Sequence, residues 1–137
     1  MFNKALILVL ALLLMPAPAI AKSTWRSDRA LQENLWAYGQ DVRWNDFEAA
    51  AEALDPALVQ GERFSEQDEA YYKAFQISGY QLKSSVMLDP LNYSQRVELR
   101  IIDLATQVER TKTDRQSWRY DAAAKRWWLT SGLPKLD

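Results

Sequence analysis

The chain has 137 residues with 17 Lys and Arg, 18 Asp and Glu and a net charge of −1, and it contains neither cysteine nor histidine. These absences exclude disulfide bonds, soft-ligand zinc sites and every catalytic arrangement that depends on histidine. The balanced charge, without a dense basic patch, argues against nucleic acid as a partner.

The first 21 residues have the pattern of an export signal. Lys4 provides a positive start, an apolar run follows at residues 5–15, and small residues precede Lys22. The apolar run is shorter than the roughly 20 residues that a bilayer span requires. We therefore expect cleavage between Ala21 and Lys22, no stable membrane span afterwards, and a periplasmic or secreted protein.

Residues 22–137 have the size of one domain, whose core must rest on packing, largely of the six Trp, six Tyr and three Phe that they contain. Residues 22–72 carry five basic and 11 acidic side chains, whereas residues 73–137 carry 11 basic and seven acidic ones. The simpler interpretation is an acidic helical layer packed on a basic sheet. The alternative is a basic sheet face presented to an anionic partner.

Two or three helices are expected first. Ser27 is a candidate N-cap for a helix whose apolar residues recur at helical spacing. Asn45 is a candidate cap for a second helix, with Glu48 in the capping-box position and Trp44 as a hydrophobic staple. This helix should end at Asp55-Pro56, because a residue before proline disfavours the helical conformation. Ser65 is predicted to cap a short acidic helix that ends near Tyr72. The apolar residues of the first helix are Leu31, Leu35, Tyr38 and Val42.

From residue 73 the hydrophobic period changes to two, which is typical of strands. The phase of the alternation flips at Ser78-Gly79 and predicts a β-bulge there. A turn with Pro at its second position is expected at residues 89–92.

Residues 96–130 should form a meander of three further strands. If Ile102 pairs with Gln107, then Ile101 faces Val108 across the first hairpin. A second hairpin around residues 122–124 would place Trp118 opposite Trp128 on the core face and Trp127 outside, beneath Arg119.

The elements predict an α+β fold, with two or three N-terminal helices packed on a curved antiparallel sheet of about four strands. This order, the stretch Trp44-Asn45-Asp46-Phe47-Glu48 and the closing hairpin at residues 118–128 resemble the nuclear-transport-factor-2-like superfamily, in particular its small exported bacterial members. The resemblance implies a cystatin-like cone over residues 28–131. Enzymatic members, such as ketosteroid isomerases and scytalone dehydratases, work in a pocket inside the cone. The absence of histidine separates this chain from the dehydratases.

Three charged residues of the third strand share a face with core residues. Arg110, Lys112 and Asp114 would line the cone if that face is concave, and a spare cation could then hold an anionic ligand. The simpler interpretation, which we favour, is that strand twist carries these side chains into solvent.

A carboxylate inside the cone could also act as a general base. Asp114 and Asp103 are the candidates, with Tyr80 and Tyr93 as hydrogen-bond donors, although Asp103 also suits a turn. Trp118 belongs to an aromatic cluster that suits core packing better than sugar binding.

Taken together, the sequence favours an exported, non-catalytic binding or protein-interaction domain without cofactor or metal. Its expected partner is an envelope protein or a small ligand, and a homodimer through the outer sheet face is compatible with the fold. A cofactor-free lyase or isomerase and a structural subunit of an envelope complex are the alternatives.

Overall fold

The computed structural model describes residues 20–137, with side chains from Arg26 onward. The helical part consists of α1 (Ile20–Arg43), α2 (Phe47–Ala50), the 3₁₀ turns η1 (Ala51–Ala53) and η2 (Pro56–Leu58), and α3 (Glu66–Lys73). The strands are β1 (Phe75–Asp89), β2 (Asn92–Asp103), β3 (Val108–Asp121) and β4 (Arg126–Leu129). They form one antiparallel sheet in the order β1-β2-β3-β4. The predicted α+β fold is confirmed.

Residues 1–19, which make up most of the predicted export signal, lie outside the described residues. The predicted cleavage site between Ala21 and Lys22 falls in the first turn of α1. Within residues 20–137, no helix has both the length and the apolar character needed to cross a membrane.

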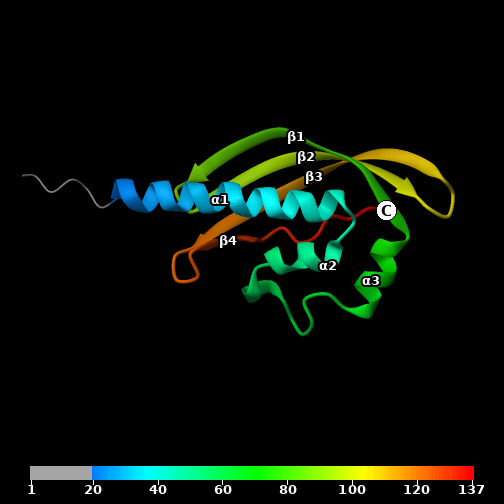
Figure 1. Cartoon of the computed structure of the whole chain (residues 1–137), viewed down its shortest axis with the longest axis horizontal. Helices are drawn as coiled ribbons and strands as arrows, with labels where there is room; N and C mark the ends of the chain where they lie inside the picture. Colours follow the sequence, from blue (N-terminus) through cyan, green and yellow to red (C-terminus); the bar gives the residue numbers. More distant parts are fainter. Residues whose placement is uncertain (1–19) are drawn as a thin grey trace, which may run out of the picture.

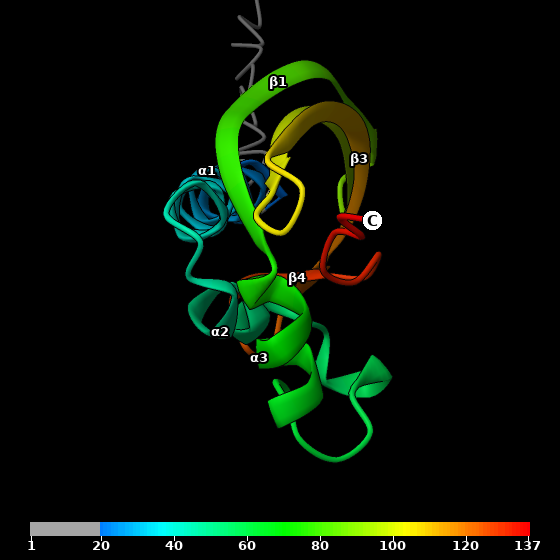
Figure 2. The ribbon, with the colours of Figure 1, turned by 90° about the vertical axis from the view of Figure 1, so that its right-hand side faces the viewer.

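The sheet curls into an open cone, and α1 lies along the gap between its two edge strands, β1 and β4 (Figures 1 and 2). At the β1 side, a Cβ on Gly39 would lie 3.5 Å from the ring of Tyr80, which is an ordinary van der Waals contact, so helix and strand lie close together here. At the β4 side, Asn34 Oδ1 accepts a 2.8 Å hydrogen bond from the backbone N–H of Trp127. The helix therefore covers both edges of a sheet that does not close on itself.

Bulges bend β1. Its pairing with β2 is irregular between Ile77 and Gly79, as the phase flip at Ser78-Gly79 predicts, and again between Leu82 and Ser84 and between Met87 and Asp89. Each extra residue bends the strand and increases its twist. The result is the long arch of β1 over the cone in Figure 2.

The core lies on the concave face of the sheet, between β2, β3, β4 and the helices. Three of the four residues predicted for the inner stripe of α1 are fully buried, and Leu35 is half-buried. The alternation in β2 is confirmed, since its apolar side chains point inward. Burial of each such side chain contributes roughly 1.5–3 kcal/mol. The innermost residues of α1 and β2 are Tyr38, Val42, Val97, Leu99 and Ile101.

Two predicted helix caps are wrong. Ser27 lies inside α1, which begins upstream of it, and its carbonyl oxygen accepts a 2.7 Å hydrogen bond from Trp127 Nε1. Asp46, not Asn45, caps α2 by accepting a hydrogen bond from the N–H of Ala49. The predicted cap of α3 is confirmed, since Ser65 forms a capping box with Asp68.

Trp44 is not the predicted hydrophobic staple. Its side chain is 80% exposed, and Nε1 donates a 3.3 Å hydrogen bond to Gln40 Oε1 on the outer side of α1. The following residue, Asn45, has a φ of +59° and turns the chain sharply, which directs Trp44 away from the core.

Both hairpins of the meander have registers that differ from prediction. Ile101 pairs with Arg110 instead of Val108, a shift of two residues that leaves each side chain on its predicted face. In the second hairpin Trp118 pairs with Leu129 instead of Trp128, a shift of one residue. A one-residue shift exchanges the two faces of a strand.

The exchange decides which tryptophan enters the core. Trp127 is fully buried beside Tyr120, whereas Trp128 lies on the outer face under the guanidinium of Arg126, 3.8 Å from its ring centroid. The predicted inward Trp128 is therefore wrong, and so is the predicted stacking of Arg119 over Trp127. Arg119 instead forms a bidentate ion pair with the buried carboxylate of Asp55.

We expect Trp127→Ala to lower the free energy of unfolding by roughly 3–5 kcal/mol, because it leaves a large cavity in the core. The matched variant Trp128→Ala removes an outer-face cation–π contact and should cost about 1 kcal/mol. Urea denaturation of both variants measures the difference. A loss at Trp128 equal to that at Trp127 would contradict the observed register.

Candidate functional site

The concave face of β3 carries polar side chains whose burial increases along the strand: Arg110 is exposed, Lys112 and Asp114 are half-buried, and Gln116 is buried. Arg110, Lys112 and Asp114 lie directly opposite the apolar residues of β2. Further along the strand, Gln116 and Trp118 are fully buried. These side chains include most of the site residues predicted from the sequence, so the structure brings those predictions together on one face.

The inner part of this face is a continuous hydrogen-bonded network. Gln116 Nε2 donates to Asp114 Oδ2 at 3.0 Å and to the hydroxyl of Tyr80 at 3.2 Å. Gln95 Nε2 donates to Gln116 Oε1, and the hydroxyl of Tyr93 donates to Gln95 Oε1, both at 2.8 Å. Tyr80 and Tyr93, two of the predicted ligand-binding residues, are therefore held by neighbouring side chains.

Asp114 is the one carboxylate in this network. Burial raises its pKa above the ordinary value, while the hydrogen bond from Gln116 acts in the opposite direction. Within residues 20–137 no ion pair involves Asp114. The interpretation in which all three charged residues face solvent is therefore wrong for Asp114, because the arch of the sheet turns this part of β3 inward.

The hydroxyl of Tyr38 is buried without a hydrogen-bond partner in the described part of the chain. Its ring meets that of Trp118 edge-to-face, with centroids 5.3 Å apart. Burial raises the pKa of Tyr38, and the nearby charge of Asp114 raises it further. An unpaired hydroxyl near a carboxylate of raised pKa is an arrangement that can take part in proton transfer or bind one polar atom.

Arg110 and Lys112 hold the last residues of the chain instead of a free anion. Arg110 Nη2 donates to the carbonyl oxygen of Leu136, and Lys112 Nζ donates to that of Asp137. On the opposite side, the N–H of Leu136 donates to the hydroxyl of Tyr71 at 2.8 Å. The side chain of Leu136 is 0% exposed and belongs to the core cluster.

This C-terminal segment, residues 133–137, lies between α3 and β3 at the end of the cone that faces the viewer in Figure 2. Tyr72 adds a 2.9 Å hydrogen bond from its hydroxyl to the carbonyl oxygen of Pro134. The mouth of the cone is thus filled by the chain itself. The two cations of the predicted ligand site thus have acceptors within the C-terminal segment, and the binding of an anionic ligand by a spare cation stays a prediction.

Asp103 serves the turn between β2 and β3. Its Oδ1 accepts hydrogen bonds from the N–H groups of Ala105 at 2.9 Å and Thr106 at 3.3 Å. The turn interpretation of Asp103 is confirmed.

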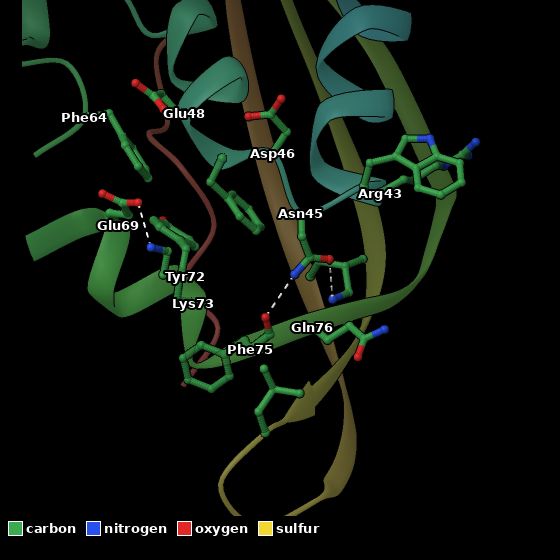
Figure 3. A pocket seen from close by; sticks show the side chains of 14 residues that line it. Arg43, Asn45, Asp46, Glu48, Phe64, Glu69, Tyr72, Lys73, Phe75 and Gln76 are labelled. Carbon is green, nitrogen blue, oxygen red and sulfur yellow. Dashed lines mark hydrogen bonds and ion pairs between the residues drawn. The ribbon is translucent and has the colours of Figure 1, made fainter. Parts of the chain in front are cut away.

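A second region, outside the cone, is an open pocket of about 640 Å³ between the end of α1, α2, α3 and the start of β1 (Figure 3). Aromatic rings form part of its lining, since Phe47 stacks on Tyr72 at 4.2 Å and Phe64 lies 6.1 Å from Tyr72 between centroids. Trp44 extends from the rim into solvent. Asp114 does not line this pocket.

Asn45 fixes the pocket wall on β1. Its Nδ2 donates to the carbonyl oxygen of Phe75, and its Oδ1 accepts from the N–H of Ile77, both at 2.9 Å (Figure 3). One amide side chain therefore occupies the donor and acceptor of the strand edge as a neighbouring strand would. This role could not be told from a helix cap in the sequence, because Asn suits both a helix N-cap and a side chain that bonds to the backbone of a strand edge.

The charges around the pocket are unequal. Lys73 is paired with Glu69 at 2.8 Å, whereas Asp46 and Glu48 stand exposed on the other wall without a basic partner among the described residues. Burial and the charge of Asp46 raise the pKa of the adjacent Asp41. This wall is therefore acidic, and the one further cation in the described lining, Arg43, donates to the carbonyl oxygen of Tyr80 at 3.4 Å. From the sequence, only the acidic composition of the helices pointed to such a wall.

Within residues 20–137, no group of three or more acidic residues is arranged to hold a metal ion.

No protein-family model matches the chain, and neither does any curated protein. Among solved structures, a candidate SnoaL-like polyketide cyclase [carbohydrate phosphatase] from Mesorhizobium loti is 11% identical, with a TM-score of 0.44 and coverage of 73% of this chain and 93% of that one. An NTF2-like protein with a cystatin-like fold from Novosphingobium aromaticivorans is 13% identical, with a TM-score of 0.46 and coverage of 82% of each chain.

A candidate scytalone dehydratase from Novosphingobium aromaticivorans is 12% identical, with a TM-score of 0.39 and coverage of 80% and 83%. Each of the three is similar to this chain over most of its length. The resemblance to the nuclear-transport-factor-2-like superfamily stays a prediction, and the activities in these descriptions belong to those proteins.

The raised pKa of Asp114 leads to a prediction for the stability of the variant Asp114→Asn. Because the pKa is raised in the folded state, the ionised carboxylate destabilises the fold at neutral pH, and a neutral Asn avoids this cost. The wild type should therefore be less stable than the variant at pH 7. The stability of the wild type should approach that of the variant as the pH falls through the raised pKa of Asp114 towards the ordinary value of 3.8, because the carboxyl group of the folded protein then binds a proton.

Urea denaturation of the two proteins across this pH range measures the difference, and titrations common to both cancel. A difference that stays constant with pH, or that grows as the pH falls, would show that Asp114 is not desolvated.

Proposed function

We propose that this protein is a non-catalytic binding domain that works outside the cytoplasm and recognises a partner through the open pocket of Figure 3. The observation that carries the proposal is the contrast between two regions. The cone interior is closed by residues 133–137, with Leu136 buried in the core, whereas the pocket between α1, α2, α3 and β1 is open and bordered by an exposed indole.

The chemistry of the pocket favours a peptide segment of another protein. Exposed aromatic side chains contribute strongly to protein–protein recognition, and Trp44 lies on the rim of the pocket that Phe64 and Tyr72 also line. The acidic wall of Asp46 and Glu48 suits a basic group on the partner. The expected ligand is therefore a segment with an apolar or aromatic side chain next to a Lys or Arg.

Export is part of the proposal and rests on the sequence of residues 1–21. N-terminal sequencing of the protein recovered from the periplasm or medium should begin at Lys22. Recovery there of a chain that still starts at Met1 would reject cleavage.

The outer sheet face, considered from the sequence as a dimer or complex surface, carries charged and hydroxyl side chains rather than aromatic ones along β2 and the facing part of β3. It therefore supports an aromatic interface less well than the pocket does. Exposed apolar side chains such as Leu88 and Leu91 near the β1–β2 turn offer a homodimer or an envelope complex a second surface, but one without the aromatic lining of the pocket, so we rank these roles lower.

A cofactor-free lyase or isomerase is the second candidate function. It is favoured by the unpaired, buried hydroxyl of Tyr38 near Asp114, whose raised pKa suits proton transfer. In such an enzyme the substrate would have to displace residues 133–137 and break the contacts of Leu136 with Arg110 and Tyr71. The cost of that displacement is the reason to rank binding first.

Selection from a phage-displayed peptide library on the folded domain tests the pocket. Enriched peptides should carry a basic residue beside an apolar or aromatic one. Their affinity should fall by about tenfold or more in Trp44→Ala and in Glu48→Lys, since both remove groups that border the pocket.

The matched control is Trp36→Ala, which removes a 69% exposed indole from α1 outside the pocket. This variant should bind the selected peptides like the wild type. The proposed surface would be rejected if Trp36→Ala and Trp44→Ala lowered the peptide affinity equally. It would also be rejected if neither Trp44→Ala nor Glu48→Lys changed that affinity.

A further inference from the structure

The outer face of the sheet brings two arginines together. Arg96 on β2 and Arg115 on β3 are direct cross-strand partners. Both lie on the face opposite the buried Val97 and Gln116, and both are exposed. Like charges placed directly opposite each other destabilise a sheet unless something neutralises them.

Nothing in the described part of the chain neutralises this pair. Arg96 Nε donates a 2.8 Å hydrogen bond to the neutral Ser84 Oγ, and Arg115 has no hydrogen bond or ion pair within residues 20–137. The nearest acidic residue along β2, Glu98, forms its ion pair with a third cation, since its Oε2 lies 3.6 Å from Lys83 Nζ. The two guanidinium groups therefore present their donors to solvent.

A hollow of about 230 Å³ lies beside them. It lies next to the irregularity of the β1–β2 pairing between Leu82 and Ser84. Its size suits one small chemical group better than a protein segment. Among the residues that border the hollow, Ser84 and Ser94 share the outer face with Arg96, whereas Ser85 pairs with the inward-facing Gln95.

We propose that this hollow, the Arg96–Arg115 hollow, binds a tetrahedral oxyanion such as a phosphate or sulfate group. Guanidinium groups form bidentate, charge-assisted hydrogen bonds with such oxyanions, and two of them would share one dianion. The serine hydroxyls supply further donors. The site lies on the convex face and is separate from both the cone interior and the pocket of Figure 3.

Thermal unfolding with inorganic phosphate tests the site, with sodium chloride at matched ionic strength as the reference. Phosphate should raise the midpoint of the wild type in a saturable way, because a ligand that binds only the folded state stabilises it. In Arg96→Gln and Arg115→Gln, half-saturation should require about tenfold or more phosphate, because each variant loses charge-assisted hydrogen bonds.

Arg100→Gln is the matched control, since Arg100 is exposed on the same face of β2 but does not border the hollow. It should respond to phosphate like the wild type. Inorganic sulfate should reproduce the phosphate response, because the proposal rests on tetrahedral geometry and charge. The proposal is overturned if Arg115→Gln and Arg100→Gln respond equally, or if chloride alone reproduces the wild-type shift.

Arg115→Glu provides a second measurement. In chloride buffer it should unfold at a higher temperature than Arg115→Gln, because an opposite charge then faces Arg96. It should also lose the phosphate response. A lower midpoint than Arg115→Gln, or a retained phosphate response, would contradict the proposal.

Discussion

The polar character of the concave face of β3 is the constraint on which the rest of this structure depends. In an antiparallel sheet with one buried face, the inward residues of neighbouring strands normally supply an apolar surface together. Here β2 does so with Val97, Leu99 and Ile101, but β3 places Arg110, Lys112 and Asp114 directly opposite them. Lys112 and Asp114 are half-buried and need a partner to offset their desolvation, whereas Arg110 is exposed.

The partners come from different parts of the chain. Backbone carbonyl groups of the C-terminal segment accept from the two cations, and Gln116 donates to the carboxylate. Leu136 then fills the space that these contacts enclose. The same segment therefore provides the acceptors for the cations and fills the mouth of the cone. Because the interior is closed, we place recognition in the open pocket outside it.

The order and type of the elements could be predicted from the sequence, because the change from helical to strand periodicity at residue 73 is strong. The strand registers could not, because they depend on loops whose ends the hydrophobic pattern does not mark. Each of the last two hairpins has a four-residue loop that ends in a residue at positive φ, Gln107 or Lys125, and begins after an aspartate.

Those aspartates were the missed signal. Asp103 and Asp121 each accept hydrogen bonds from the N–H groups two and three residues on, as an Asp at the start of a turn does. Reading both as the last paired residue of a strand fixes both registers and assigns Trp127 to the core. The C-terminal segment gave no comparable signal, because its contacts with α3 and β3 join residues far apart in the sequence.

Hydrogen exchange at the backbone N–H of Leu136 tests the closed cone most directly. This N–H donates to the hydroxyl of Tyr71 beside a fully buried side chain, so its exchange should be slow and comparable to that of the buried residues of β2. Exchange at the rate of an unstructured chain, while the amides of β2 stay protected, would contradict the account. It would mean that the segment leaves the mouth freely and that the interior around Asp114 is open to ligands.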